Sequence, residues 1–152
     1  MPTTKMKSPY KKWLIAIFAL LVAGGAVIWW MFNLKYEDTA AVKADHSVNA
    51  MDFIKEFKQD MAVANKKYSE KIIAVNGVVS AIEMADTTAN IKMIDTASGA
   101  YIIFAFQQQH LAEAKQMKEG DKVSIKGSCS NGAFSSILET EYITFKRCAL
   151  NN

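Results

Sequence analysis

The sequence has 152 residues, of which 51% are hydrophobic and 22% are charged, with a formal net charge of +3. Four of the 18 basic residues precede residue 13, whereas all 15 acidic residues follow residue 36, so the chain after residue 12 carries a net charge of −1. This balance excludes the strongly basic footprint of a typical nucleic-acid-binding domain, and the 118 residues after residue 34 exclude a second domain of ordinary size.

An uncharged segment at residues 13–34 follows four lysines within the first 12 residues. As an α-helix this segment extends about 33 Å, enough to cross a hydrocarbon layer of about 30 Å. Trp13 and Trp29 near its ends suit the two membrane interfaces. The lysines predict a cytoplasmic stub at 1–12 and place the chain after residue 35 outside the cytoplasm. A cleaved signal peptide is the alternative, which the length of the segment disfavours.

A polar segment at residues 35–47 has no clear period and predicts a linker. From residue 48 to 66, apolar side chains recur at spacings of three and four residues. This pattern predicts an amphipathic helix, which Ser47 or Asn49 can cap. The apolar stripe consists of Ala50, Phe53, Ile54, Phe57, Met61 and Ala64.

The rest of the chain is rich in β-branched and aromatic residues that alternate in short segments. We predict strands at 71–82, 91–94, 101–106, 123–127 and 142–150, a helix at 107–118, and a loop at 128–140 that contains Asn131 and Gly132. Three strands, one helix and two strands is the order of the OB-fold, a five-stranded barrel. Gly77 in the long first strand suits a strand that coils around such a barrel.

Four segments carry a resemblance to a known family: Phe53 with Phe57, residues 68–79, residues 117–129 and residues 143–150. The chain resembles the tRNA-anti-like OB-fold family, a group of mostly uncharacterised bacterial envelope proteins. The resemblance implies an all-β, β-rich fold, in which residues 68–150 form a five-stranded OB-fold barrel with one inter-strand helix. Together with the predicted anchor, it implies a single-pass protein of the bacterial inner membrane with a cytoplasmic N-terminus and a periplasmic OB domain.

Two cysteines, Cys129 and Cys148, would lie in an oxidising compartment, where they could form a disulfide. In a plain hairpin around a loop at 130–140, Cys129 lies opposite residue 141 and Cys148 opposite residue 122. This pairing places the thiols about 20 Å apart, beyond the reach of a disulfide. A loop that folds back could still join them, and two buried core thiols are the alternative.

The sequence shows none of the recognisable catalytic motifs: no paired carboxylates, no nucleophile with a base and no glycine-rich phosphate loop. His46 falls in the predicted linker and His110 on the predicted short helix, and neither has a second histidine at ligand spacing. We expect both at the solvated surface. The sequence therefore predicts a protein without enzymatic activity, metal site or cofactor.

Three other functions stay open. Met84 and Met93 flank the first hairpin and could serve a Cu(I) chaperone, although filling a core is the commoner role of methionine. A haem chaperone with an N-terminal anchor and a periplasmic OB barrel has the same layout, but this chain has no histidine after its last predicted strand. Nucleic-acid binding would use aromatic and basic residues of the second and third strands, and the charge and the compartment argue against it.

The predicted function is therefore a membrane-anchored, extracytoplasmic binding module that acts as an interaction or accessory subunit. Its expected partners are the lipid bilayer and a protein of the cell envelope. A periplasmic chaperone for a ligand, metal or haem is one alternative, and a nucleic-acid-binding OB-fold is the other. The predicted binding surface consists of Lys92, Tyr101, Gln107, Gln109 and Phe134.

Overall fold

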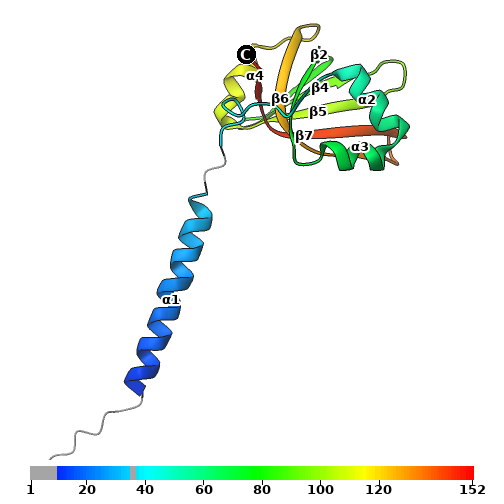
Figure 1. Ribbon diagram of the computed structural model, residues 1–152. Helices are drawn as coiled ribbons and strands as arrows, with labels where there is room; N and C mark the ends of the chain where they lie inside the picture. The colour runs from blue at the N-terminus through cyan, green and yellow to red at the C-terminus, as the bar shows by residue number, and fades with distance from the viewer. Residues whose placement is uncertain (1–9, 35–36) are drawn as a thin grey trace, which may run out of the picture. The chain divides into compact units, whose positions relative to one another are not determined.

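The computed structural model describes residues 10–34 and 37–152, and the chain divides into two compact units after Tyr36 (Figure 1). In the described residues, the first unit is a single helix and the second contains every strand. The predicted flanking residues Lys5, Lys7 and Lys35 lie outside the described residues, as does most of the predicted stub at 1–12.

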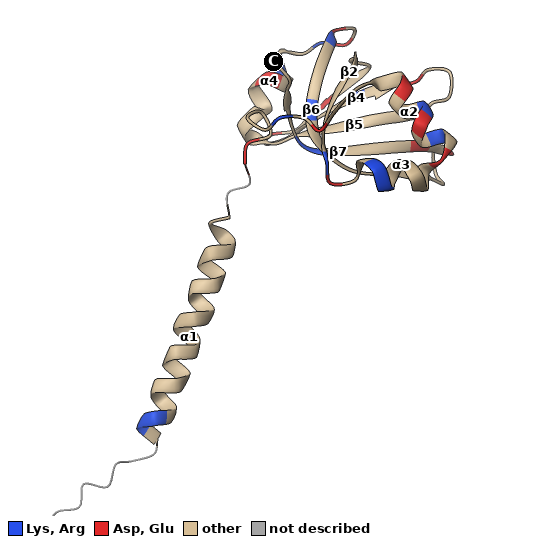
Figure 2. Cartoon of the chain, viewed as in Figure 1, with Lys and Arg blue, Asp and Glu red and all other residues tan. Residues whose placement is uncertain are grey.

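Helix α1, Tyr10–Phe32, has 23 residues and covers most of the predicted apolar segment. Its mean hydropathy reaches 2.4, and Figure 2 shows charged residues only in its first turn. None of its side chains is buried within the chain. By length and composition, α1 is a candidate for a membrane span or a signal anchor.

The helix predicted at 48–66 is present as two helices, α2 (Ala50–Gln59) and α3 (Met61–Tyr68). The side chain of Asn49 accepts a hydrogen bond from the N–H of Met51 at 2.9 Å and caps α2, as predicted. Asp60 has an extended backbone that ends α2, and its carboxylate accepts from Val63 to cap α3. The predicted apolar stripe of α2 is buried: Ala50, Phe53, Ile54 and Phe57.

The β-rich fold is confirmed, with one mixed sheet in the order β1-β2-β6-β7-β5-β4-β3. The strands are β1 (His46–Asn49), β2 (Ile72–Val78), β3 (Ala81–Met84), β4 (Ala89–Ile94), β5 (Tyr101–Phe106), β6 (Lys122–Ser135) and β7 (Thr140–Leu150). Strands β1 and β2 are parallel, as are β5 and β7, and the other neighbours are antiparallel. The predicted helix between strands is present as the short turn η1 (Gln108–His110) followed by α4 (Leu111–Gln116).

The sheet has seven strands where the sequence predicts five, so the pairing does not confirm a closed five-stranded barrel. The predicted first strand is divided at Val79 and Ser80 into β2, which pairs with β6, and β3, which pairs with β4. The additional strand β1 includes the last two residues of the predicted linker. Glycine at position 77 allows the side chain of Met93 to pack against the backbone of β2, because a Cβ there would lie only 2.6 Å from Met93 Sδ.

The prediction of a loop at 128–140 is wrong, because most of these residues belong to strands. Strand β6 continues to Ser135 and β7 begins at Thr140, with bulges that shift the register near Ser128 and Asn131. Gly132 lies within β6, and the ring of Phe57 packs directly against it. This contact leaves no room for a Cβ at position 132. Asn65 of α3 secures the same point by hydrogen bonds to both backbone groups of Gly132. Close packing, and not a turn, therefore accounts for this glycine.

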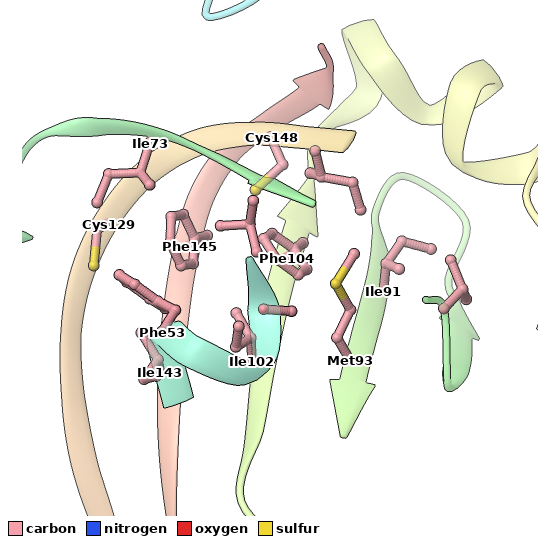
Figure 3. Close-up of a cluster of buried hydrophobic side chains, with 14 of the residues drawn as sticks. Phe53, Ile73, Ile91, Met93, Ile102, Phe104, Cys129, Ile143, Phe145 and Cys148 are labelled. Carbon is pink, nitrogen blue, oxygen red and sulfur yellow. The ribbon is translucent and has the colours of Figure 1, made fainter. Parts of the chain in front are cut away.

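The core lies between α2 and one face of the sheet (Figure 3). Aromatic rings meet at its centre: Phe53 lies 5.8 Å from Phe145, and Phe145 lies 5.1 Å from Phe104. Met93 is fully buried there, whereas Met84 at the end of β3 is exposed. The two methionines of the copper hypothesis therefore lie in different environments, and Met93 fills the core.

Candidate binding face

Alternating side chains give β4 and β5 one buried face and one accessible face. On β5, Ile102, Phe104 and Phe106 are buried, whereas Tyr101 and Ile103 are partly exposed. Strand β4 alternates in the same way, with Lys92 on its accessible side. The accessible face extends across β7, because β5 and β7 pair in register.

Two tyrosines stack on this face. Tyr101 of β5 is the register partner of Tyr142 of β7, and their ring centroids are 5.9 Å apart with the rings 18° from parallel. The ammonium of Lys92 lies 5.7 Å from the centre of the Tyr101 ring, within the range of a cation–π contact. We call Lys92, Tyr101 and Tyr142 the tyrosine platform.

The charge of the tyrosine platform is balanced by a neighbouring strand. Lys92 Nζ forms an ion pair with Glu83 of β3 at 2.5 Å. The carboxylate offsets the attraction that Lys92 would exert on a phosphate, and such attraction supplies most of the affinity for nucleic acids. The platform therefore offers flat aromatic surface with little net charge.

The prediction that both histidines lie at the solvated surface is wrong for His110, which is buried, whereas His46 stays partly exposed. His46 is half-buried in β1, with its ring edge-on to Tyr68 at 5.4 Å. His110 is 8% exposed, with Nε2 at 2.6 Å from Asp38 Oδ1 and Nδ1 at 2.8 Å from Glu113 Oε1. Burial alone would lower the pKa of His110, but its hydrogen bonds to the two carboxylates raise this pKa above its ordinary value.

Both cysteines are buried free thiols. The register places Cys129 opposite Phe145 and pairs Lys126 with Ala149, so the two cysteines are about three residues apart along the hairpin. This offset corresponds to roughly 10 Å instead of the predicted 20 Å, because the hairpin turns at residues 136–139, later in the chain than the centre of the predicted loop. Burial raises the pKa of Cys129 to about 12 and raises that of Cys148 as well, which makes both thiols poor nucleophiles. Their pairing under oxidising conditions stays a prediction.

A family model described as tRNA_anti-like matches residues 6–139, which is most of the chain. The chain belongs to this family. The predicted family membership is thus confirmed. No curated protein matches the chain.

Solved structures match parts of this tRNA_anti-like chain. One is a lipoprotein from Klebsiella pneumoniae subsp. pneumoniae MGH 78578 whose name proposes nucleic-acid binding, with 18% identity and a TM-score of 0.55 over 69% of this chain and 91% of that chain. Another is a protein from Leishmania major Friedlin named as a proposed aspartyl-tRNA synthetase, with 10% identity and a TM-score of 0.45 over 78% of this chain and 22% of that chain. At these identities the first similarity shows a shared fold alone.

The structure brings only part of the predicted binding surface together. Lys92 and Tyr101 meet in the tyrosine platform, and Tyr142 joins them although the sequence analysis did not single it out. The predicted strand at 142–150 begins with Tyr142, but the sequence did not indicate that this strand pairs with β5. Gln107 and Gln109 are exposed beyond the far end of β5.

Phe134 lies apart from the tyrosine platform. It shares its side of β6 with Gly132, which faces α2, and its register partner is Glu141 and not Tyr142. Its side chain is 57% exposed, close in sequence to the exposed residues Ile137 and Leu138 of the hairpin loop. The predicted surface therefore comprises three separate regions of the tRNA_anti-like unit.

Proposed function

We propose that this protein is a binding module without catalytic activity that holds a protein partner in the bacterial cell envelope. The observation that carries the proposal is the tyrosine platform, a stacked aromatic pair on an accessible face of little net charge. Tyrosine is enriched at protein interfaces, because its large ring gains contact area at low entropic cost and its hydroxyl can still bind a polar partner.

The proposed location is the inner membrane, with α1 as a single-pass anchor, the N-terminus in the cytoplasm and the strands on the outer side. The lysines that precede the apolar segment support this orientation. The structural similarity to a lipoprotein fits an envelope location. We also propose that the sheet curls into an OB-type barrel. Strands β2 and β3 lie near opposite ends of the strand order, yet only Val79 and Ser80 join them, so the two ends of the sheet must lie close together.

Site-specific photocrosslinking in intact cells tests the proposal. A photoreactive phenylalanine at Tyr142 should yield one discrete crosslinked protein, and the same group at exposed Ala112 of α4 serves as the control position. A Tyr101→Ala change in the same chain should reduce the product from position 142. Absence of any protein adduct at position 142, or equal adducts at both positions, would reject the platform as a protein-binding face.

Nucleic-acid binding is the second candidate, because stacked aromatic rings beside a lysine also suit single-stranded bases. The name of the Klebsiella pneumoniae lipoprotein points the same way. The ion pair between Lys92 and Glu83 opposes it. We expect no saturable binding of a labelled single-stranded oligonucleotide at physiological salt; binding that falls steeply as salt rises and is lost in Tyr101→Ala would favour this candidate instead.

A further inference from the structure

A strap of docked chain, residues 37–45, lies where the sequence predicts a linker. Thr39 within it is 3% exposed. At its end, the backbone N–H of Asp45 donates to the carbonyl of Ile72 at 2.7 Å, and the Asp45 carboxylate accepts from the N–H of Ile72 at 2.9 Å. The strap is therefore part of the folded unit.

Lys126 of β6 holds the middle of the strap. Its ammonium donates to the carbonyl oxygens of Ala40 at 3.0 Å and Val42 at 2.7 Å, and the lysine is itself buried. These hydrogen bonds satisfy a buried cation that would otherwise be costly. They do not depend on the charge of any histidine.

At the beginning of the strap, Asp38 forms a hydrogen bond with the ring of His110. Both ring nitrogens of His110 face a carboxylate, Asp38 on one side and Glu113 on the other. A neutral imidazole has a single N–H and can donate to only one of them, whereas the imidazolium donates to both. The geometry therefore suits the protonated ring.

We propose that the Asp38–His110–Glu113 clasp is a pH-sensitive latch that fixes the strap to the folded unit while His110 is protonated and frees its first residues when His110 loses that proton. The proposal is independent of what the tyrosine platform binds.

The two carboxylates are held unequally, which decides where the latch opens. Glu113 Oε2 also accepts from the backbone N–H of Leu150 at 2.8 Å, so it stays in place on α4. Among the residues that the structure describes, the other hydrogen bond of the Asp38 carboxylate lies within the strap, from the N–H of Ala40. After deprotonation, the remaining ring N–H donates to the anchored Glu113, and the bare Nε2 lone pair faces the Asp38 carboxylate and repels it.

The charged groups that face the ring are Asp38 of the strap and Glu113 of α4. Lys126 of β6 attracts the Asp38 carboxylate, and the backbone N–H of Leu150 in β7 donates to Glu113. The two carboxylates raise the pKa of His110 despite its burial. A histidine whose pKa is raised by folding stabilises the closed strap fully below its unfolded value of about 6.5, and this contribution is lost as the pH rises through the raised pKa.

Hydrogen exchange measures the latch in the full chain, reconstituted in lipid nanodiscs. The protection of the amides of Ala40 and Ala41, which donate to the side chain and the carbonyl of Asp38, should be constant at acidic pH after correction for the intrinsic exchange rate at each pH. It should fall about tenfold as His110 deprotonates, the effect of losing one hydrogen bond to a charged group. NMR of histidine-labelled protein should show that the fall follows the His110 titration, and His46→Gln leaves one signal to assign.

Two variants separate the latch from a general effect of pH. His46→Gln, the matched control, should keep the pH-dependent loss of protection. Asp38→Asn should remove it and keep the strap protected at alkaline pH, because an amide can donate to the neutral ring. Protection in the wild type that does not change with pH, or an unchanged pH dependence in Asp38→Asn, would overturn the proposal, as would the loss of the dependence in His46→Gln.

Discussion

The two faces of the sheet at β4, β5 and β7 share one backbone and differ in almost everything else. On the covered face, Phe104 and Phe145 are fully buried and their side chains interlock beneath α2. On the open face, the rings of Tyr101 and Tyr142 stack on each other and stay partly exposed. The covered face determines stability, and the open face is free to determine binding. Substitutions on each face can test this division.

The largest effect is expected from Phe104→Ala on the covered face. Removing a fully buried ring leaves a cavity, so the free energy of unfolding should fall by about 3–5 kcal/mol. Pulse proteolysis in urea measures this loss in the full chain, whereas tryptophan fluorescence cannot, because all tryptophans lie at residues 13–30.

Tyr142→Ala, the matched change on the open face, should cost only about 0.5–1.5 kcal/mol from the lost ring stacking. Equal losses in Phe104→Ala and Tyr142→Ala would contradict the division between the two faces.

A middle-sized effect is expected from Gly132→Ala. The added methyl group would collide with the Phe57 ring, and relieving the contact should destabilise the folded unit by about 1–3 kcal/mol. The neighbouring change Ala133→Gly alters the other side of β6 and serves as the control. A Gly132→Ala variant as stable as the wild type would show that α2 moves away from β6 without cost.

The smallest effect is expected from Lys92→Met, which removes the ion pair with Glu83. Partly exposed ion pairs contribute about 0–1 kcal/mol, so the urea midpoint should barely change. Binding to the proposed protein partner should persist because the tyrosines remain. A marked loss of stability would mean that Lys92 supports the fold of the open face, which would weaken its assignment to the binding surface.

The helices could be predicted from the spacing and composition of residues that are neighbours in the sequence. The stripe from Ala50 to Phe57 predicted the buried side of α2, and the helical composition of residues 107–118 predicted the helix between β5 and β6. The break between α2 and α3 could also have been predicted from the sequence, because aspartate is a common N-cap residue of helices. Asp60 has this role, and its carboxylate accepts a hydrogen bond from the N–H of Val63.

The errors arose where residues distant in sequence meet. Asn131 and Gly132 have the composition of a turn, but contacts from Phe57 and Asn65 make them part of a strand. His110 looked solvated because its partner Asp38 lies 72 residues earlier in a segment without periodicity. Two of the three residues of the tyrosine platform were predicted, and Tyr142 was missed for the same reason, since it reaches Tyr101 only through pairing of β7 with β5.

The docked strap also sets the length of the tether between α1 and the folded unit. With Asp38 bound, five residues at 33–37 follow the last residue of α1, and such a segment can span no more than about 18 Å. Release of the strap as far as Ala40, where the hydrogen bonds of Lys126 begin, would lengthen the connection to seven residues and about 25 Å. A tethered module that explores a larger volume meets a fixed membrane partner at a lower effective concentration. Opening the latch would therefore weaken encounters with such a partner without altering a single residue of the binding face.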